Sequence, residues 1–399
     1  MTDRSAPYLR HRLQERVGEF IALRREIHAH PELAFQEHRT AALVARKLSA
    51  WGYEVVTGLG GTGVVGTLHR GHGSRRLGIR ADMDALPMSE ATGHAWSSQT
   101  PGVMHACGHD GHTATLLAAA KHIAEQGTFD GTLHLIFQPA EEGAAGAVRM
   151  MEDGLFDRFP CDAIFALHNM PGTPAGHFSF RTGATMASSD NVTITLQGVG
   201  GHGAMPHTTA DPLVAASSIV MALQTVVSRN VDPLHSAVVT VGALQAGQAN
   251  NVIPDQATLK LSVRALDPEV RSLLKQRIHE LVTQQAASYR VRAAIDWQDG
   301  YAVLINDNAC TTLATDLAIR MFGPERVTPH AAPITASEDF AFMLQRVPGC
   351  YFFVGNGAAG TPGGCMVHNP GYDFNDHIIG DGAAFWSALV HEYLMPVHN

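Results

Sequence analysis

The sequence is poor in charged and aromatic residues and lacks the runs that mark several protein classes. Charged residues make up 16% of the 399 residues and aromatic residues 7%, whereas about 25% of an average globular chain is charged. Hydrophobic residues reach 45%, so the chain can build a full core, and a largely disordered chain is excluded. No basic run offsets the net charge of −9, so we expect neither a nucleic acid nor a membrane as partner.

Cysteine is scarce as well. The chain has 5 cysteines, an odd number, and no CxxC pair, which indicates reduced thiols rather than a disulfide framework. Neither an uninterrupted apolar run of about 18 residues nor an apolar N-terminal segment is found. We therefore expect no membrane span and no secretory signal, and predict a cytoplasmic protein. Histidine is abundant instead, with 23 residues, no two of them adjacent.

Strand-like and helix-like patterns alternate in the first half of the chain and again near its end. The strand-like runs are 77–81, 132–137, 163–167 and 351–354, and the helix-like segments are 35–50, 112–125, 144–152, 309–321 and 382–394. This alternation predicts an α/β fold with a mostly parallel sheet and helices on both of its faces.

The middle of the chain has a different pattern. It reads as strand, helix, two strands, helix and strand, at 190–197, 212–229, 236–245, 256–266, 268–287 and 290–297. This order is that of the ferredoxin-like α+β unit. We therefore predict an inserted domain at 185–298, within a catalytic domain made of 1–184 and 299–399. The edges of so small an open sheet often pair with a second chain, which favours a dimerisation role.

Acidic and histidine side chains follow three of the predicted strands. Asp82 and Asp84 come after the first, Glu141 and Glu142 after the second, and His168 after the third. Because α/β sheets bind ligands outside the carboxyl ends of their strands, we expect these side chains to share one site. Any one of them alone would more often be structural than a ligand.

Further metal-binding residue types lie between these strands. Cys107 and His109 are two apart in a Gly-containing loop and can converge on one ion. Together with Glu142, His168 and the distant His368, they make five candidate ligands, which is more than one tetrahedral ion binds. Two ions sharing a bridging ligand are therefore expected, an arrangement that activates water for hydrolysis. Adjacent glutamates point in different directions, so one can bind metal while the other takes a proton from water.

Several motifs, taken together, resemble the M20 metallopeptidase family, and nearest its branch of hippurate hydrolases, N-acyl-amino-acid amidohydrolases and plant auxin-conjugate hydrolases. They occur in family order over nearly the whole chain. They are REIHAHPE (25–32), RADMDALP (80–87), MHACGHDGH (104–112), FQPAEEG (137–143), ALHN (166–169), GHGAMPH (201–207), NVIP (251–254), SEDF (337–340) and VHNP (367–370).

The resemblance implies a role for each matching residue. The implied metal ligands are Cys107, His109, Glu142, His168 and His368. Glu141 matches the general base, and Asp84 matches an acid that orients a metal ligand. Asp82 stands where other branches have a metal-binding histidine. In the inserted domain, His202 matches a histidine supplied to the partner subunit's site and Asn251 matches a substrate contact. Arg264 is a candidate for holding a substrate carboxylate, but it equally fits the polar side of a half-exposed alternating strand at 259–264.

The predicted function is metal-dependent hydrolysis of the amide bond of N-acyl amino acids. We expect two divalent ions per subunit, from Zn, Mn, Co or Ni, and a homodimer or a dimer of dimers. A dipeptidase or aminoacylase of the same chemistry remains an alternative. So do a thiol amidase with Cys107 as nucleophile and a binding protein without catalytic activity.

Overall fold

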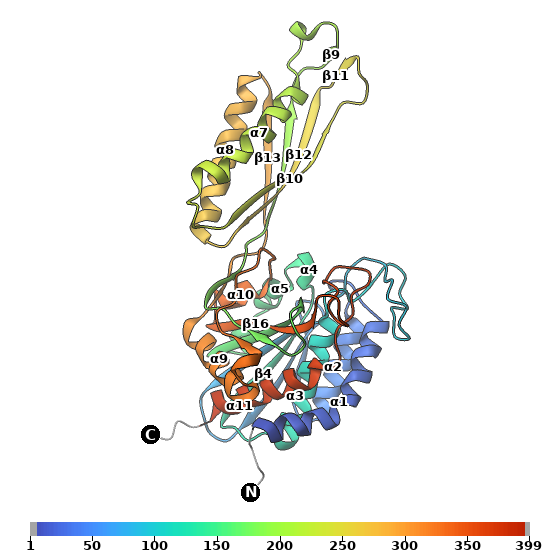
Figure 1. Ribbon diagram of the computed structural model, residues 1–399, viewed down its shortest axis with the longest axis vertical. Coiled ribbons are helices and arrows are strands. Elements are labelled where there is room, and N and C mark those ends of the chain that lie inside the picture. Colours follow the sequence, from blue (N-terminus) through green and yellow to red (C-terminus); the bar gives the residue numbers. More distant parts are fainter. Residues whose placement is uncertain (1–5, 396–399) are drawn as a thin grey trace. The chain divides into compact units, whose positions relative to one another are not determined.

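The computed structural model describes residues 6–395, which form two compact units (Figure 1). Unit 1 consists of the chain up to Gly183, Asn306–Ala332, and the chain from Phe342 onward. Unit 2 consists of Ala184–Ile305 and Pro333–Ala341. The insertion predicted at 185–298 lies inside the longer segment of unit 2. The short return at 333–341 has no counterpart in the prediction, because no change of pattern marks it.

Unit 1 is built on an eight-stranded sheet in the order β1-β2-β4-β3-β5-β16-β6-β15. Its strands are β1 (Glu54–Leu59), β2 (Gly63–Arg70), β3 (Arg76–Asp82), β4 (Gly131–Gln138), β5 (Ala163–Gly172), β6 (Phe178–Ser179), β15 (Val327–Thr328) and β16 (Gly349–Ala358). The four pairings β3–β4, β3–β5, β5–β16 and β6–β15 are parallel. The predicted α/β fold with a mostly parallel sheet is therefore confirmed.

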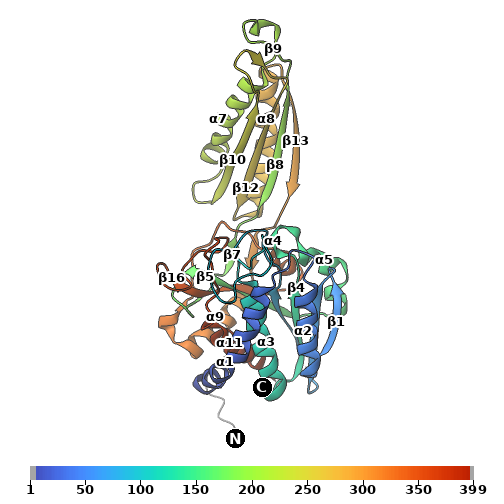
Figure 2. The same ribbon diagram turned by 90° about the vertical axis from the view of Figure 1, so that its right-hand side faces the viewer.

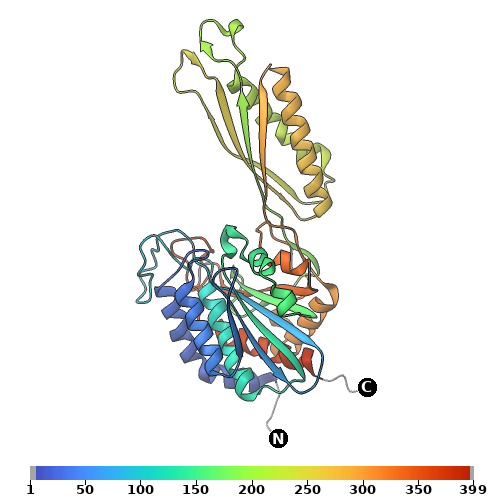
Figure 3. The same ribbon diagram turned by 180° about the vertical axis from the view of Figure 1, so that it is seen from behind.

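Helices of unit 1 cover both faces of this sheet. They are α1 (Ala6–Ala29), α2 (His38–Ala50), α3 (His109–Gln126), α4 (Glu141–Ala144), α5 (Gly146–Glu152), α6 (Leu155–Arg158), α9 (Asn308–Phe322) and α11 (Ile378–Leu394). In β2, a Cβ at Gly66 would meet Leu48 of α2, whereas one at Gly63 would meet Met150 of α5. Because these glycines are three residues apart in a strand, they face opposite sides. Figure 3 shows the blue helices α1 and α2 along one side of the sheet.

The main core of unit 1 lies on the face covered by the long helices. Alternate residues of β4, namely Leu133, Leu135 and Phe137, are fully buried in it with apolar residues of α1, α3 and α11. Burying such a side chain contributes roughly 1.5–3 kcal/mol. This core holds rigid the strand ends from which the polar residues project.

Unit 2 has a four-stranded antiparallel sheet in the order β10-β12-β8-β13. Its elements are β8 (Asp190–Gln197), β9 (Gly201–His202), α7 (Pro212–Asn230), β10 (Ala237–Ala246), β11 (Val252–Ile253), β12 (Gln256–Ala265), α8 (Pro268–Ser288) and β13 (Arg292–Asp299). Helices α7 and α8 lie side by side on one face of the sheet (Figure 2). Asp211 and Asp267 cap them, each followed by a proline at the first helical position. The predicted ferredoxin-like order is confirmed.

Among the described residues, one helix, α7, is long and apolar enough to cross a membrane by length and composition alone. Ser217, Ser218, Gln224 and Thr225 interrupt its apolar residues, so it is not the uninterrupted apolar run that the sequence lacks. In the structure α7 is a core helix of unit 2. Ala215, Ala216, Ile219, Leu223 and Val226 are fully buried in the second hydrophobic cluster. This packing explains the apolar residues of the buried face, whereas Leu213, Val214 and Met221 of the same helix are exposed.

Candidate metal centre

The loop before α3 brings Cys107 and His109 into the site. The prediction that both lie in a loop is wrong for His109, which is the first residue of α3. Gly108 is the N-cap, with φ 94°, a conformation that favours glycine. A Cβ there would lie 2.4 Å from both Asn169 Nδ2 and Tyr372 Oη. The helix therefore begins at His109, three residues before the predicted 112, and both the positive φ and the close packing require glycine at its N-cap.

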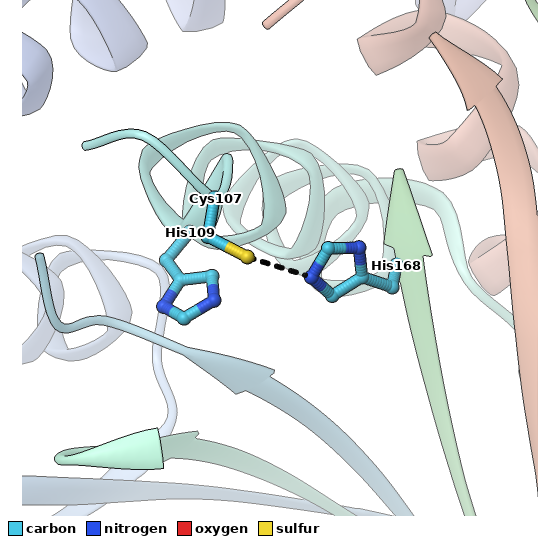
Figure 4. A group of neighbouring side chains, drawn as sticks. All are labelled: Cys107, His109 and His168. Atoms are coloured by element: carbon cyan, nitrogen blue, oxygen red, sulfur yellow. Dashed lines mark hydrogen bonds between the residues drawn. The ribbon is translucent and has the colours of Figure 1, made fainter. Parts of the chain in front are cut away.

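His168 lies inside β5 rather than after it. The strand was predicted to end at 167, but it continues to Gly172, paired with β16. The apolar sequence pattern ends at the polar residues His168 and Asn169, but the backbone pairing of β5 with β16 continues past them. His168 Nδ1 donates to the Asn169 carbonyl at 2.7 Å, and Nε2 lies 3.3 Å from Cys107 Sγ (Figure 4).

The five predicted ligands form two groups that share one atom. Cys107, His109 and His168 offer ligand atoms within 4.8 Å of one another, and so do Cys107, Glu142 and His368. The shared member is the Cys107 thiol. Figure 4 shows the Cys107, His109 and His168 side chains turned toward one another. Two groups with a common thiol are the arrangement needed to hold two ions with one bridging ligand.

Asp84 accepts hydrogen bonds from two of these residues and orients them. His109 Nδ1 donates to Asp84 Oδ1 at 3.1 Å, and the backbone N–H of Glu142 donates to Asp84 Oδ2 at 2.8 Å. The first bond leaves His109 Nε2 as the free nitrogen. This atom is buried and has no hydrogen-bond partner among residues 6–395. A buried, unpartnered imidazole nitrogen backed by a carboxylate fits a metal ligand.

Asp82 and His112 form a third cluster with His109, with ligand atoms within 4.8 Å of one another. The polar side-chain atoms of Asp82 and His112, however, already have partners in the protein. His112 Nδ1 donates to Asp82 Oδ1 at 2.6 Å, and His112 Nε2 accepts the Asn169 N–H at 3.1 Å. Arg80 forms a buried ion pair with the Asp82 carboxylate. With both ring nitrogens engaged, His112 has none left for a metal, and the pair supports the neighbouring strands.

The electrostatics of the centre favour a bound cation. Burial, together with Glu142, Glu141 and Asp82, raises the pKa of the Cys107 thiol well above its usual value. Burial opposes charge on His109, but Asp82 and Asp84 outweigh it and raise its pKa to about 10. Burial and the neighbouring His112 lower the pKa of His168, which keeps its imidazole neutral. A cation would compensate the acidic groups and displace the protons of Cys107 and His109.

His368 closes the centre on its solvent side. Its side chain is 52% exposed, and its Nε2 lies 3.1 Å from Glu142 Oε1. The backbone N–H of His368 donates to the Ala106 carbonyl at 2.8 Å, which ties the two ligand-bearing loops together. Its φ of 60° is uncommon for a residue with a Cβ. Such conformations cluster at functional sites.

Glu141 is the first residue of α4 and is buried. An oxygen of its carboxylate lies within 4.8 Å of ligand atoms of His109 and Glu142. The side chains of the two adjacent glutamates therefore have different neighbours, as expected for consecutive residues. Glu142 belongs to the cluster with Cys107 and His368, and Glu141 does not.

The three remaining predicted residues belong to unit 2. His202 of β9 pairs with Val252 of β11, and the Asn251 carbonyl accepts the Gly203 N–H at 2.8 Å, so His202 and Asn251 are neighbours. Arg264 lies near the C-terminal end of β12. It is about 25 Å along the strand from Gln256, the first residue of β12, which closely follows β11 in the chain. The Arg264 guanidinium donates to the Thr335 carbonyl at 2.9 Å. Unit 2 therefore brings His202 and Asn251 together but not Arg264.

Sequence reasoning missed the supports of the centre. Asn169 Nδ2 donates to the Cys107 carbonyl at 2.7 Å, and its Oδ1 accepts from Tyr372 Oη at 2.6 Å. The sequence signal that could have identified Asn169 as a supporting residue was its position directly after His168. Glu37 accepts the Ala140 N–H at 2.9 Å, and nothing local in the sequence links these two residues.

Comparison with known proteins agrees with this geometry. The chain is 45% identical over 377 residues to hippurate hydrolase of Campylobacter jejuni, covering 94% of this chain and 97% of the relative. It is 39% identical over 366 residues to N-acetyl-L-cysteine deacetylase of Bacillus subtilis, covering 90% and 85%. A dinuclear metal-binding M20 peptidase of Bacillus subtilis superposes with a TM-score of 0.82 at 32% identity, covering 95% and 98%. Residues 78–392 match the model of peptidase family M20/M25/M40, and the chain belongs to that family.

Proposed function

We propose that this protein is a metal-dependent amidohydrolase that cleaves N-acyl amino acids into a carboxylic acid and a free amino acid. The observation that carries the proposal is the pair of ligand groups sharing Cys107 beside the buried Glu141. The two curated relatives support the substrate class, since hippurate and N-acetylcysteine are both N-acyl amino acids. A thiolate and imidazole donor set favours transition metals such as Zn, Co or Ni, and Mn, which the carboxylate of Glu142 suits, stays among the proposed ions.

Each residue of the centre has a proposed part in the reaction. Cys107, His109, Glu142, His168 and His368 would hold the ions. When bound, the ions polarise the amide carbonyl and acidify the attacking water. Glu141 takes the proton of that water and passes it to the leaving nitrogen. Asp84 keeps His109 in the tautomer whose Nε2 carries no proton and would be free to bind an ion.

A Cys107-dependent thiol amidase is disfavoured by the environment of the thiol. The nucleophile in such enzymes is a thiolate with a lowered pKa. Burial and three nearby carboxylates act in the opposite direction on Cys107. The five free cysteines agree with a reducing compartment, and we propose that the protein is cytoplasmic.

Removal of metal is expected to abolish hydrolysis, and a divalent transition metal is expected to restore it. The measurement is amino acid release from N-benzoyl, N-acetyl and indole-acyl amino acids, with dipeptides as the comparison set. Each assay is run on chelated protein and after addition of Zn, Mn, Co or Ni. Full activity in a verified metal-free sample would refute the proposal. Preference for dipeptides would assign the chain to the neighbouring dipeptidase chemistry.

Unit 2 is proposed to supply His202 to the active site of a partner subunit, where it donates a hydrogen bond to the developing oxyanion. Asn251, its neighbour, and Arg264 are proposed substrate contacts. The support is that His202 is exposed on unit 2, whereas all five proposed ligands belong to unit 1. A two-fold dimer would exchange this residue reciprocally.

Co-expression of His202→Ala with Glu141→Gln, each inactive alone, is expected to restore about a quarter of wild-type activity. In a mixed dimer one site carries both lesions and the other carries neither. Random pairing makes half of the dimers mixed, and each has one intact site. Two different tags show whether mixed dimers form. Mixed dimers without recovered activity would mean that His202 acts on its own subunit or takes no part.

A further inference from the structure

A buried carboxylate outside the ligand set lies close to the chain that carries Glu141. Glu37 precedes α2 and is 0% exposed. Its Oε1 accepts the backbone N–H groups of Phe35 at 3.0 Å and Ala140 at 2.9 Å, and its Oε2 accepts from Thr62 Oγ1 at 2.5 Å. Phe35 is two residues from Glu37 in sequence, Thr62 is 25 residues away and Ala140 is 103 residues away. The bond of longest range ends at the residue directly before Glu141.

Ala140 has a conformation that its own sequence does not favour. Its φ of 54° and ψ of 44° are left-handed, a region that residues with a Cβ seldom occupy. Both of its backbone polar groups are engaged, because its N–H donates to Glu37 and its carbonyl accepts the Gly146 N–H at 2.9 Å. An unfavourable conformation persists only where the surroundings determine it. The Glu37 carboxylate is one of these two restraints.

Glu141 is therefore held on both sides along the chain. On its N-terminal side the Ala140 amide is bound by Glu37, and on its C-terminal side the Glu142 amide is bound by Asp84 at 2.8 Å. Rotation at Ala140 would swing the Glu141 side chain as a whole. A displacement of about 1 Å at a reacting group can cost about 10²-fold in rate.

We propose that Glu37 is a positioning residue that fixes the Glu141 carboxylate by holding the Ala140 amide in its left-handed conformation. The inference rests on the proposed function, in which Glu141 is the base. The Glu37 carboxylate accepts hydrogen bonds from Phe35, Thr62 and Ala140, none of which is a proposed ligand, and it is proposed to act through the Ala140 backbone. Its loss should therefore slow the chemical step and spare metal binding and substrate binding.

Three substitutions separate this role from general support of the fold. Glu37→Gln keeps an oxygen for the Ala140 and Phe35 amides, and its NH₂ can donate to the Thr62 hydroxyl. Glu37→Met has similar length but no acceptor. Glu32→Met is the matched control, since Glu32 accepts from the Arg39 and Thr40 amides at the start of the same helix, at 2.9 Å each, and does not reach Ala140.

Glu37→Met is expected to lower kcat about 10- to 100-fold with KM and metal content unchanged, whereas Glu37→Gln and Glu32→Met stay within about 3-fold of wild type. Hydrogen exchange of the Ala140 amide, followed in metal-free protein on a peptide spanning 137–143, should accelerate in Glu37→Met and in neither other variant. If Glu37→Met does not fold, Glu37→Asp, which withdraws the acceptor by one methylene, is expected to show the same changes to a smaller extent.

The activity assay and the hydrogen-exchange measurement test the proposed function and the Glu37–Ala140 bond separately. A wild-type protein that hydrolyses no N-acyl amino acid refutes the proposed function, and the exchange measurement still reports on the Glu37–Ala140 bond. The positioning role is overturned if Glu37→Met retains wild-type kcat or if Glu32→Met loses kcat equally. Unchanged exchange at Ala140, or loss of metal from Glu37→Met, would also overturn it.

Discussion

Glu141→Gln is expected to lower kcat by a factor of about 10³, within the range of about 10²–10⁴ attributed to general acid–base catalysis. The amide has nearly the shape of the carboxylate but cannot take a proton from water. Glu141 lies beside the ligand cluster with Cys107 and His368 without belonging to it, so metal content should stay at two ions per chain. Substrate affinity should also be retained, because the change affects the chemical step.

Glu142→Gln is the matched control, one residue further along the same turn. Glu142 belongs to the group with Cys107 and His368, so its neutralisation should release metal as well as activity. Steady-state kinetics, metal analysis after dialysis and binding of an uncleaved substrate analogue measure the three quantities. Wild-type turnover by Glu141→Gln, or equal metal loss from both variants, would show that the base is assigned to the wrong glutamate.

Cys107→Ala is expected to lose both ions and to reduce activity by about 10³ or more, since metal ions supply several kcal/mol of transition-state stabilisation. The physical reason is that one sulfur belongs to both ligand groups. Removal of any other ligand leaves one group intact, but removal of Cys107 leaves neither. Cys107→Asp should restore part of the activity, because carboxylate oxygens can also bridge two ions.

Cys161→Ala is the matched control for Cys107. Its thiol donates to the Phe159 carbonyl at 3.4 Å and belongs to neither ligand group, so metal content and turnover should be unchanged. Alkylation of wild-type protein adds an independent measurement, because bound metal should protect Cys107 and chelation should expose it. Two ions retained by Cys107→Ala, or equal labelling with and without metal, would contradict a bridging thiolate.

The sequence was sufficient to predict β3, β4, β5 and β16 of the first sheet and the four strands of the second, because apolar periodicity continues wherever residues serve the core, but β1, β2, β6 and β15 were not predicted. The strand pattern at 132–137 corresponds to β4 (Gly131–Gln138), and the pattern of the middle segment corresponds to the strands and helices of unit 2. The predictions were wrong where polar site residues interrupt that periodicity. His109 is the first residue of a helix and His168 continues a strand, whereas His109 was predicted in a loop and His168 directly after the end of the strand. Local pattern fails where side chains serve the site rather than the core.

It was predictable from the sequence that Asp82, Asp84, Glu141, Glu142 and His168 lie close together, because strand ends meet at one edge of a parallel sheet. Cys107, His109 and His368 were added as predicted ligands from their residue types and the family resemblance. The residues that support these ligands were not predicted. Glu37 acts on a backbone amide 103 residues away, and Asn169 binds the Cys107 carbonyl across 62 residues. Backbone amides and carbonyls carry no sequence signature, so these contacts become visible only in three dimensions.

The order of the strands in unit 1 also determines when during synthesis the centre can form. β16 lies between β5 and β6, but it is made after the whole four-stranded sheet of unit 2, and His368 follows it. Since chain segments fold as they emerge from the ribosome, the inserted sheet can be complete while β5 still lacks a neighbour. A nascent chain ending before 349 holds Cys107, His109, Glu142 and His168 but not His368. If His368 holds the second ion as proposed, uptake of that ion would belong to the last stage of folding, after nearly all of the chain has been made.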